Sequence, residues 1–148
     1  MNSSVTTLRN STIYANTGIT ATGGVTNSTG TIIFQNTILA GNVGGNCANA
    51  AGAIQSNGGY NIDSETTCGF GSGSGSMSST DPLLGPFGNY GGSTKTVSLL
   101  PGSPAINAIV GNMNCPATDQ RGVLRPQGPR CDIGAFEAAY LFLPLILR

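Results

Sequence analysis

The N-terminal part of the chain repeats itself, and this repeat constrains the fold more than any other feature. Residues 12–15, Thr-Ile-Tyr-Ala, recur as Thr-Ile-Leu-Ala at residues 37–40, an offset of 25. The same offset carries Leu8 onto Ile33. Sequence repeats with a period of about 20 to 50 residues are typical of solenoids and repeat arrays. The sequence therefore predicts that successive repeats stack on one another.

The apolar runs within each repeat are too short to form helices. They are two to four residues long and are separated by Gly, Asn and Thr, whereas a helix shows its periodicity over about 10 to 12 residues. Three short strands per repeat are typical of a parallel β-helix. Equivalent residues of stacked strands lie about 4.8 Å apart. We therefore expect ladders that place Ile13 over Ile38 and Ala15 over Ala40, and turns whose Asn side chains hydrogen-bond along the stack.

The composition supports this expectation and excludes other classes. Charged residues make up 8% of the chain, against about 25% in an average domain, and stacked like charges would repel. Gly, Asn, Ser and Thr together account for nearly half of the residues, and helix formers at a 3.6-residue period are scarce. Six basic residues face six acidic ones, so a nucleic-acid partner is excluded because phosphate binding needs a surplus of Lys and Arg.

The four cysteines indicate disulfides. The sequence contains no Cys-x-x-Cys pair and no His, so the usual zinc-binding patterns are missing. An even number of cysteines in a chain rich in Ser, Thr and Asn is typical of an exported protein. Three connectivities are possible, and we favour Cys47–Cys68 with Cys115–Cys131 because each pair brackets a Gly- or Pro-rich loop. Four reduced, buried thiols are the alternative.

The two ends of the chain bear on its location. The first eight residues contain neither the basic nor the apolar segment of a signal peptide, so we expect an export signal upstream and an extracellular or cell-surface location. Residues 138–148 are apolar but are only about half as long as the roughly 20 residues of a membrane span. We interpret this tail as a terminal strand that packs on the core, with a sorting or docking signal as the alternative.

We predict four parts along the chain. Repeats occupy residues 1–62 and a Gly/Ser-rich loop occupies residues 63–80, followed by a cap over residues 81–137 and the apolar tail over residues 138–148. The loop lacks the Lys and the following helix of a phosphate-binding loop, so we interpret it as a linker or surface loop.

Four motifs occur in order in the C-terminal part of the chain. They are Asp81-Pro82-Leu83, Leu100-Pro101-Gly102-Ser103-Pro104-Ala105, Asp119-Gln120-Arg121-Gly122 and Asp132-Ile133-Gly134-Ala135-Phe136-Glu137. These motifs resemble the choice-of-anchor Q domain, a module near the C-termini of exported bacterial repeat proteins. The resemblance covers residues 57–137 and implies a module that follows β-helix coils and precedes a surface-anchoring signal. The chain departs from the family pattern at Asn107, where an Asp is expected.

Five charged residues of this part are candidates for a site: Asp119, Arg121, Arg125, Asp132 and Glu137. We interpret them as an ion-pair and hydrogen-bond network that pins an irregular cap onto the last coil. The alternative is a carboxylate–Arg active site, since paired carboxylates at a set separation serve glycosidases. With no His and a single Lys, the chain has no ordinary base to activate a hydroxyl nucleophile.

A second pair of carboxylates lies at Asp63 and Glu65. The two residues are two positions apart and could share a calcium ion. Calcium takes six to eight oxygen ligands, however, and the whole chain has six carboxylate side chains. We therefore interpret the pair as a solvated edge pair.

Together these features predict an all-β fold: two to three coils of right-handed parallel β-helix with an irregular, disulfide-pinned C-terminal cap. We expect a non-catalytic exported or cell-surface protein with a structural, adhesive or display role and without cofactor or metal. Its expected partner is a cell-surface glycan or another protein chain, and the open end of the stack would permit self-association.

Two other functions stay open. One is the C-terminal part of a β-helical polysaccharide lyase or glycoside hydrolase. Arg9 is the only charged residue between Val5 and Asn61, which argues against it. The other is a passive carbohydrate-binding module in which Tyr14 and Tyr60 stack on sugars.

Overall fold

The computed structural model describes residues 4–19, 22–49, 53–56 and 58–139. These residues form short strands and two 3-10 turns and contain no α-helix, which confirms the predicted β class. The elements are β1 (Val5–Arg9), β2 (Thr12–Tyr14), β3 (Val25–Asn27), β4 (Thr31–Gln35), β5 (Ile38–Ala40), β6 (Cys47–Asn49), β7 (Ala53–Ser56), β8 (Ile62–Asp63), η1 (Gly73–Gly75), β9 (Leu84–Gly88), β10 (Thr96–Leu99) and η2 (Val110–Asn112).

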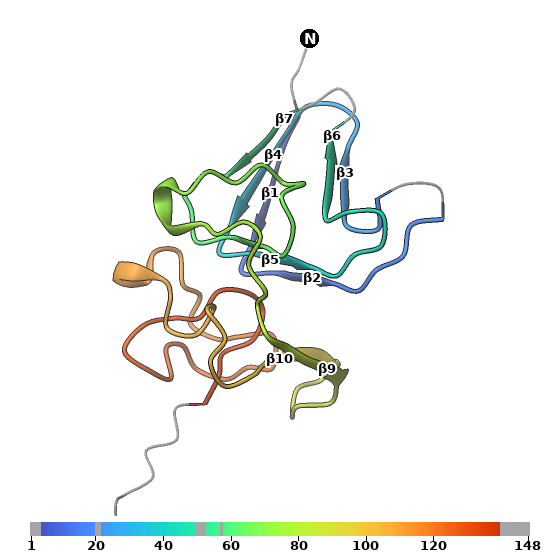
Figure 1. Cartoon of the computed structure of the whole chain (residues 1–148). Helices are drawn as coiled ribbons and strands as arrows, with labels where there is room; N and C mark the ends of the chain where they lie inside the picture. Colours follow the sequence, from blue (N-terminus) through green and yellow to red (C-terminus); the bar gives the residue numbers. More distant parts are fainter. Residues whose placement is uncertain (1–3, 20–21, 50–52, 57, 140–148) are drawn as a thin grey trace, which may run out of the picture.

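The first eight strands form three separate parallel sheets (Figure 1). Two of the sheets have three strands, in the orders β1-β4-β7 and β2-β5-β8, and the third pairs β3 with β6. Each strand therefore pairs with the equivalent strand of the next repeat, and the chain visits all three sheets before it returns to the first. From residue 81 to residue 139 the chain adds one antiparallel strand pair, β9 with β10, and otherwise consists of turns, loops, the 3-10 turn η2 and isolated bridges.

The predicted right-handed parallel β-helix of two to three coils is wrong. The sheets are short and separate, and among the described residues none of them is closed or extends into a solenoid. The repeat length is also not constant. Val5 pairs with Thr31, 26 residues on, whereas Thr31 pairs with Ala53, only 22 residues on. Two full repeats and part of a third supply too few strands of matched length for a continuous solenoid, which needs at least about three repeats.

The predicted register is wrong by one residue. Thr12 pairs with Ile38 and Ile13 pairs with Leu39, while Tyr14 pairs with Ala40. Because side chains alternate across a strand, a shift of one residue moves a side chain to the other face of the sheet. Ile13 accordingly packs with Leu39, whereas Ile38 belongs to a different cluster on the opposite face.

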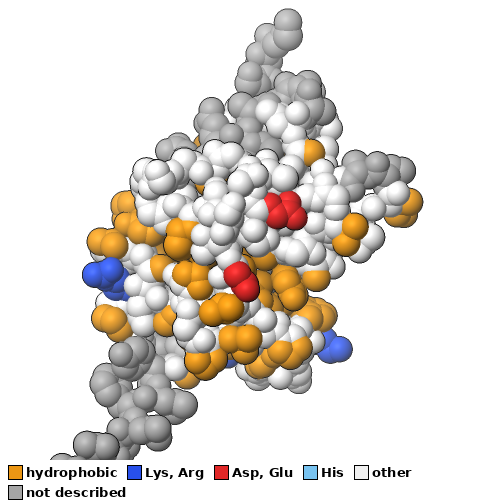
Figure 2. All heavy atoms as spheres, viewed as in Figure 1, with side chains coloured by type: hydrophobic (Ala, Val, Ile, Leu, Met, Phe, Trp, Pro, Cys, Tyr) orange, Lys and Arg blue, Asp and Glu red, His pale blue; other side chains and the backbone are white. Residues whose placement is uncertain are grey.

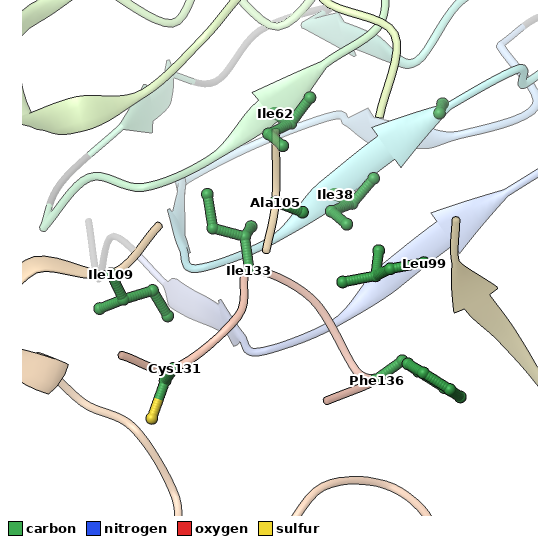
Figure 3. Packing of buried hydrophobic residues seen from close by; sticks show 9 residues of the cluster. Ile38, Ile62, Leu99, Ala105, Ile109, Cys131, Ile133 and Phe136 are labelled. Carbon is green, nitrogen blue, oxygen red and sulfur yellow. The ribbon is translucent and has the colours of Figure 1, made fainter. Parts of the chain in front are cut away.

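Two hydrophobic clusters hold the chain together. The first joins residues from all three parallel sheets and is extended by a T-shaped contact between Phe34 and Phe70, with ring centroids 5.6 Å apart. The second lies where the C-terminal segment packs against β5 and β8 (Figure 3). There Ile38 and Ile62 meet Ala105 and Ile133, and the remaining members are Ala40, Leu99, Ile109, Cys131 and Phe136. The sheet β2-β5-β8 is thus apolar on both faces.

Asn side chains hydrogen-bond between neighbouring repeats, as predicted. Asn36 Nδ2 donates to Asn10 Oδ1 at 3.2 Å, and Asn16 Nδ2 donates to Asn42 Oδ1 at 3.0 Å. From Asn42 the series continues inward, because Asn42 Nδ2 donates to Asn46 Oδ1 at 2.8 Å. Asn10 and Asn36 have φ values of 48° and 52°, a left-handed conformation in which Asn is enriched.

Of the predicted C-terminal tail, residues 140–148 lie outside the described residues. Ala138 is described, and its N–H donates to Asp132 Oδ2 at 2.6 Å. In the part of the chain that the structure describes, no helix is long and apolar enough to cross a membrane.

Candidate functional site

The structure brings together all five charged residues of the predicted C-terminal network. Asp119 pairs with Arg121 at 2.6 Å, and Arg125 faces Glu137 at 3.5 Å. The two pairs are joined because the Glu137 N–H donates to Asp119 Oδ2 at 3.0 Å. Asp132 completes the set, since its N–H donates to Glu137 Oε2 at 3.0 Å. The network lies on the loops that follow η2, at the base of the second hydrophobic cluster.

Asp119 is the most heavily hydrogen-bonded of these carboxylates. Its Oδ1 accepts from the N–H groups of Arg121 and Val123, and its Oδ2 accepts from the N–H of Glu137 and from Nε and Nη2 of Arg121. Burial by itself would raise the pKa of Asp119, but these hydrogen bonds outweigh it and hold the pKa below its ordinary value. Asp119 therefore stays ionised inside the protein.

Asp132 and Glu137 are also buried, and for these two carboxyls burial has a larger effect on the pKa than the hydrogen bonds do. It raises the pKa of both carboxyls, and hydrogen bonds to backbone N–H groups oppose it only in part. Asp132 accepts from the N–H groups of Asn107 and Ala138, at 2.7 and 2.6 Å. Glu137 accepts from those of Gln127 and Asp132, at 2.9 and 3.0 Å. Both groups thus act as acceptors for loop backbone.

The two arginines hold carbonyl oxygens in the same region. The guanidinium of Arg125 is buried and donates to the carbonyls of Asp132 and Gly134, at 3.1 and 2.7 Å. Burial lowers its pKa, and the charge of Glu137 opposes that shift. The Arg121 guanidinium donates to the Glu137 carbonyl at 2.6 Å and lies 3.5 Å above the centroid of the Phe136 ring. Each arginine therefore ties the loop to the core.

This arrangement has little catalytic capacity. A general acid or base must reach the proton that it transfers, and the side chain of Asp119 has no exposed surface. Asp132 and Glu137 are each only 1% exposed. Together the three carboxylates accept hydrogen bonds from seven backbone N–H groups. Their oxygens are engaged with the protein itself.

Asn107, at which the resemblance of the C-terminal motifs leads us to expect Asp, also serves the loop backbone. Its N–H donates to Asp132 Oδ1, and its side-chain Oδ1 accepts from the Arg130 N–H at 3.3 Å. The residue has a φ of 54°, which Asn tolerates. An uncharged amide therefore supplies the acceptor at this position.

The interpretation of Asp63 and Glu65 as a solvated edge pair is wrong. Asp63 is fully buried, and it accepts from Asn46 Nδ2 at 2.6 Å and from the N–H groups of Glu65 and Cys68. The burial follows from the position of Asp63 at the end of β8, where it terminates the series of Asn side chains from the neighbouring repeats. Within the described ranges, no group of three or more His, Cys, Asp or Glu side chains could hold a metal ion.

Both predicted disulfides are confirmed. Cys47 bonds to Cys68, with Cα atoms 4.8 Å apart, and Cys115 bonds to Cys131, with Cα atoms 6.3 Å apart. No cysteine is left free, so the alternative of four reduced thiols is excluded. The first bond ties β6 to the loop after β8, and the second ties the segment after η2 to the second hydrophobic cluster.

A groove runs along the seam between β2 and the hairpin of β9 and β10. A hollow of about 210 Å³ is bordered there by Tyr14, Phe87, Lys95, Asn16 and Gln120, together with Thr12, Thr96 and Val97. Tyr14 also borders the adjoining hollow of about 440 Å³, whose walls include Asp81, Leu83 and Leu100. Thr12 and Gln120 border a third hollow, of about 480 Å³. The three hollows therefore follow one another along the seam.

Sequence reasoning identified only part of this groove. Tyr14 was a candidate for stacking on sugars and does lie in the groove, but Tyr60, the other candidate, packs against the second hydrophobic cluster. The sequence analysis did not identify Phe87 and Lys95 as groove residues. Their segments show only an aromatic residue and a lysine among alternating apolar residues. Nothing in that pattern indicates that the hairpin lies beside β2.

Comparisons with known proteins identify no relative. No family model matches the chain, and searches of curated proteins and of solved structures find no match. The resemblance to the choice-of-anchor Q domain therefore stays a prediction.

Proposed function

We propose that this chain is a non-catalytic module of an exported or cell-surface protein, with a structural, adhesive or display role. The observation that carries the proposal is where its carboxylates lie and what they bind. Four of the six, Asp63, Asp119, Asp132 and Glu137, are buried and accept hydrogen bonds from the chain's own backbone. Groups committed to the fold in this way support a scaffold.

The two disulfides support the exported location. Such bonds persist in oxidising compartments and are rare in the cytosol, and each of the two closes a loop in one half of the chain. The four C-terminal motifs that resemble the choice-of-anchor Q domain agree with this location.

A polysaccharide lyase or hydrolase would need carboxylates that face a substrate. In the described part of the chain only Glu65 and Asp81 retain accessible carboxylates. Glu65 Oε2 accepts from the N–H of Asn46, 19 residues earlier in the chain, and Asp81 Oδ1 accepts from the Leu83 N–H in its own turn, so each also binds the chain's own backbone. The geometry thus favours the scaffold over the enzyme.

The proposal is tested by incubating the full chain with a panel of polysaccharides, with and without calcium. New reducing ends and unsaturated products are the readouts, and buffer without protein is the control. Absence of products supports the non-catalytic role. Release of products above the control would overturn it, and repeating the assay with Glu65→Gln and Asp81→Asn, which change the two accessible carboxylates, would then test which of them reacts.

The exported location has its own test. Expression in an oxidising bacterial periplasm should give folded chain in which thiol titration under denaturing conditions finds no free thiol. Free thiols in the folded, soluble product would contradict the proposed compartment.

A further inference from the structure

The groove along the seam combines exposed aromatic rings with polar side chains. Figure 2 shows that hydrophobic side chains gather over the middle and lower part of one face, where the C-terminal segment meets the parallel sheets. Tyr14 and Phe87, which both border the central hollow, are 36% and 66% exposed. Sites for small organic ligands are typically concave and apolar with a few convergent polar groups. The central hollow shares the concave shape, but five of its eight bordering residues are polar and its aromatic side chains are Tyr14 and Phe87. It adjoins a neighbouring hollow at both ends.

The Tyr14 ring packs against the bend that follows β5. A Cβ atom at Gly41 would lie 3.4 Å from Tyr14 Cε2, so the ring packs over the Gly41 backbone. Gly41 has a φ of 62°, a conformation that glycine adopts without strain. Tyr14 borders both the central hollow and the hollow of Asp81 and Leu83. It is therefore an aromatic residue that a ligand in either hollow can contact.

The polar groups around the central hollow have unused hydrogen-bonding capacity. Asn16 donates through Nδ2 to Asn42, and within the described ranges its own Oδ1 has no partner. Lys95 makes no ion pair with the described residues. Gln120 holds the backbone beside it, because its Nε2 donates to Thr94 Oγ1 and to the Lys95 carbonyl, at 3.1 and 3.2 Å. A cation thus borders a hollow that has no carboxylate in its walls.

The adjoining hollow has the opposite charge. Asp81 is exposed there, and the Leu83 N–H engages only its Oδ1. Its Oδ2 can accept hydrogen bonds from hydroxyl groups, and its charge repels a second anion. A ligand that spans both hollows therefore meets a cation on one side of Tyr14 and an anion on the other.

We propose that the groove binds a glycan in which a carboxylated sugar is joined to a neutral one. A sugar ring has an apolar C–H face that can stack on Tyr14 or Phe87 and a rim of hydroxyls that can hydrogen-bond to amides and carboxylates. The carboxylated sugar lies against Lys95, and the neutral sugar lies beyond Tyr14 beside Asp81. This inference rests on the proposed non-catalytic role and specifies what an adhesive surface would recognise.

Calorimetric titration of the full chain with three hexasaccharides tests the inference. Hyaluronan hexasaccharide alternates glucuronate with N-acetylglucosamine, chitohexaose contains only N-acetylglucosamine, and a glucuronan hexasaccharide contains only glucuronate. We expect the alternating glycan to bind most tightly. Lys95→Gln should weaken its binding about fivefold, equivalent to about 1 kcal/mol, and leave chitohexaose unaffected. Asp81→Asn should strengthen glucuronan binding alone.

Aromatic variants test the stacking contacts. Tyr14→Ala should weaken the binding of all three glycans about tenfold, and Phe87→Ala gives a second test that does not depend on the fold at Tyr14, because its side chain is largely exposed. Arg130→Gln and Leu124→Ala are the matched controls, an exposed cation and an exposed apolar residue that do not border the groove. We expect both controls to bind like the wild type.

The outcomes separate this inference from the proposed function. Three results would each overturn the glycan site and leave the non-catalytic role intact. They are no binding of the alternating glycan, equal binding of all three glycans, and an equal loss of affinity for Lys95→Gln and Arg130→Gln. Cleavage of a bound glycan, detected as new reducing ends in the same sample, would instead overturn the non-catalytic role.

Discussion

Replacing Asp119 by Asn tests whether buried carboxylates hold the C-terminal segment together. The Asp119 side chain has no exposed surface, and its two oxygens accept five hydrogen bonds from Arg121, Val123 and Glu137. Asn keeps one acceptor oxygen and places an NH₂ donor where the other oxygen was. In either orientation of the amide, at least two buried donors then face another donor.

The size of the effect follows from these contacts. A hydrogen bond to a charged group is worth about 1.5–3 kcal/mol, and breaking a buried ion pair costs about 3–5 kcal/mol. We therefore expect Asp119→Asn to lower the free energy of unfolding by about 3–5 kcal/mol at pH 7. In a chain of this length, that loss corresponds to a fall in Tm of about 10 °C.

Urea and thermal unfolding followed by circular dichroism measure this difference. Asp81→Asn is the matched control, because Asp81 is exposed and accepts from the Leu83 N–H through one oxygen, a contact that Asn can keep. We expect the control to change the free energy of unfolding by less than about 1 kcal/mol. Equal effects of the two substitutions would show that Asp119 is not a structural acceptor.

Three further predictions concern the disulfide, the core and pH. Cys115→Ser removes a bond across 16 residues and should destabilise the chain by about 3 kcal/mol in calorimetry without reductant. Phe34→Ala should cost about 3–5 kcal/mol in urea unfolding, because the side chain is fully buried. The Tm should peak near pH 4, measured from about pH 2 to pH 8. Below the ordinary carboxyl pKa of 3.8, protonation of Asp119, whose folded pKa is lowered, removes stability. Above it, the raised folded pKa values of Asp132 and Glu137 make the unfolded chain lose protons first, so stability falls.

Each of these three predictions has a control variant or a result that would contradict it. A Cys115→Ser variant that melts like the wild type would mean that this disulfide does not stabilise the fold. Ile19→Ala is the reference for Phe34→Ala, because Ile19 is 100% exposed and its truncation should leave the Tm unchanged. A Tm that rises steadily from about pH 4 to pH 7 would contradict the raised pKa values. Asp119→Asn should also flatten the acid side of the profile.

The sequence was sufficient for the disulfides and for the β class but not for the strand register. Thr-Ile-Tyr-Ala and Thr-Ile-Leu-Ala align by letter at an offset of 25, yet Ile13 lies beside Leu39. The alignment fails because both faces of β5 are covered, one by the other parallel sheets and one by the C-terminal segment. When both faces are apolar, alternation no longer marks the inward side. A register could be chosen only with knowledge of what packs on the outer face.

The groove escaped sequence analysis for a related reason. Tyr14 lies on β2 and Phe87 on β9, more than seventy residues apart. They border the same hollow because the second hydrophobic cluster holds the C-terminal segment against β5 and β8, which brings the hairpin next to β2. No local pattern in either segment encodes this arrangement.

The low charge of the chain has a structural explanation in the two halves of the fold. In the first half, backbone N–H groups find acceptors in parallel ladders, and Asn side chains satisfy the turns, so charged side chains are not needed. In the second half, residues 81–139 contain only two strands, β9 and β10. Buried N–H groups must still be satisfied, and Asp119, Asp132 and Glu137 take the place of a ladder by accepting from seven of them. Carboxylates used in this way must be buried, and burial removes them from any substrate. The same residues that satisfy this irregular segment are therefore withdrawn from its surface, as the proposed non-catalytic role requires.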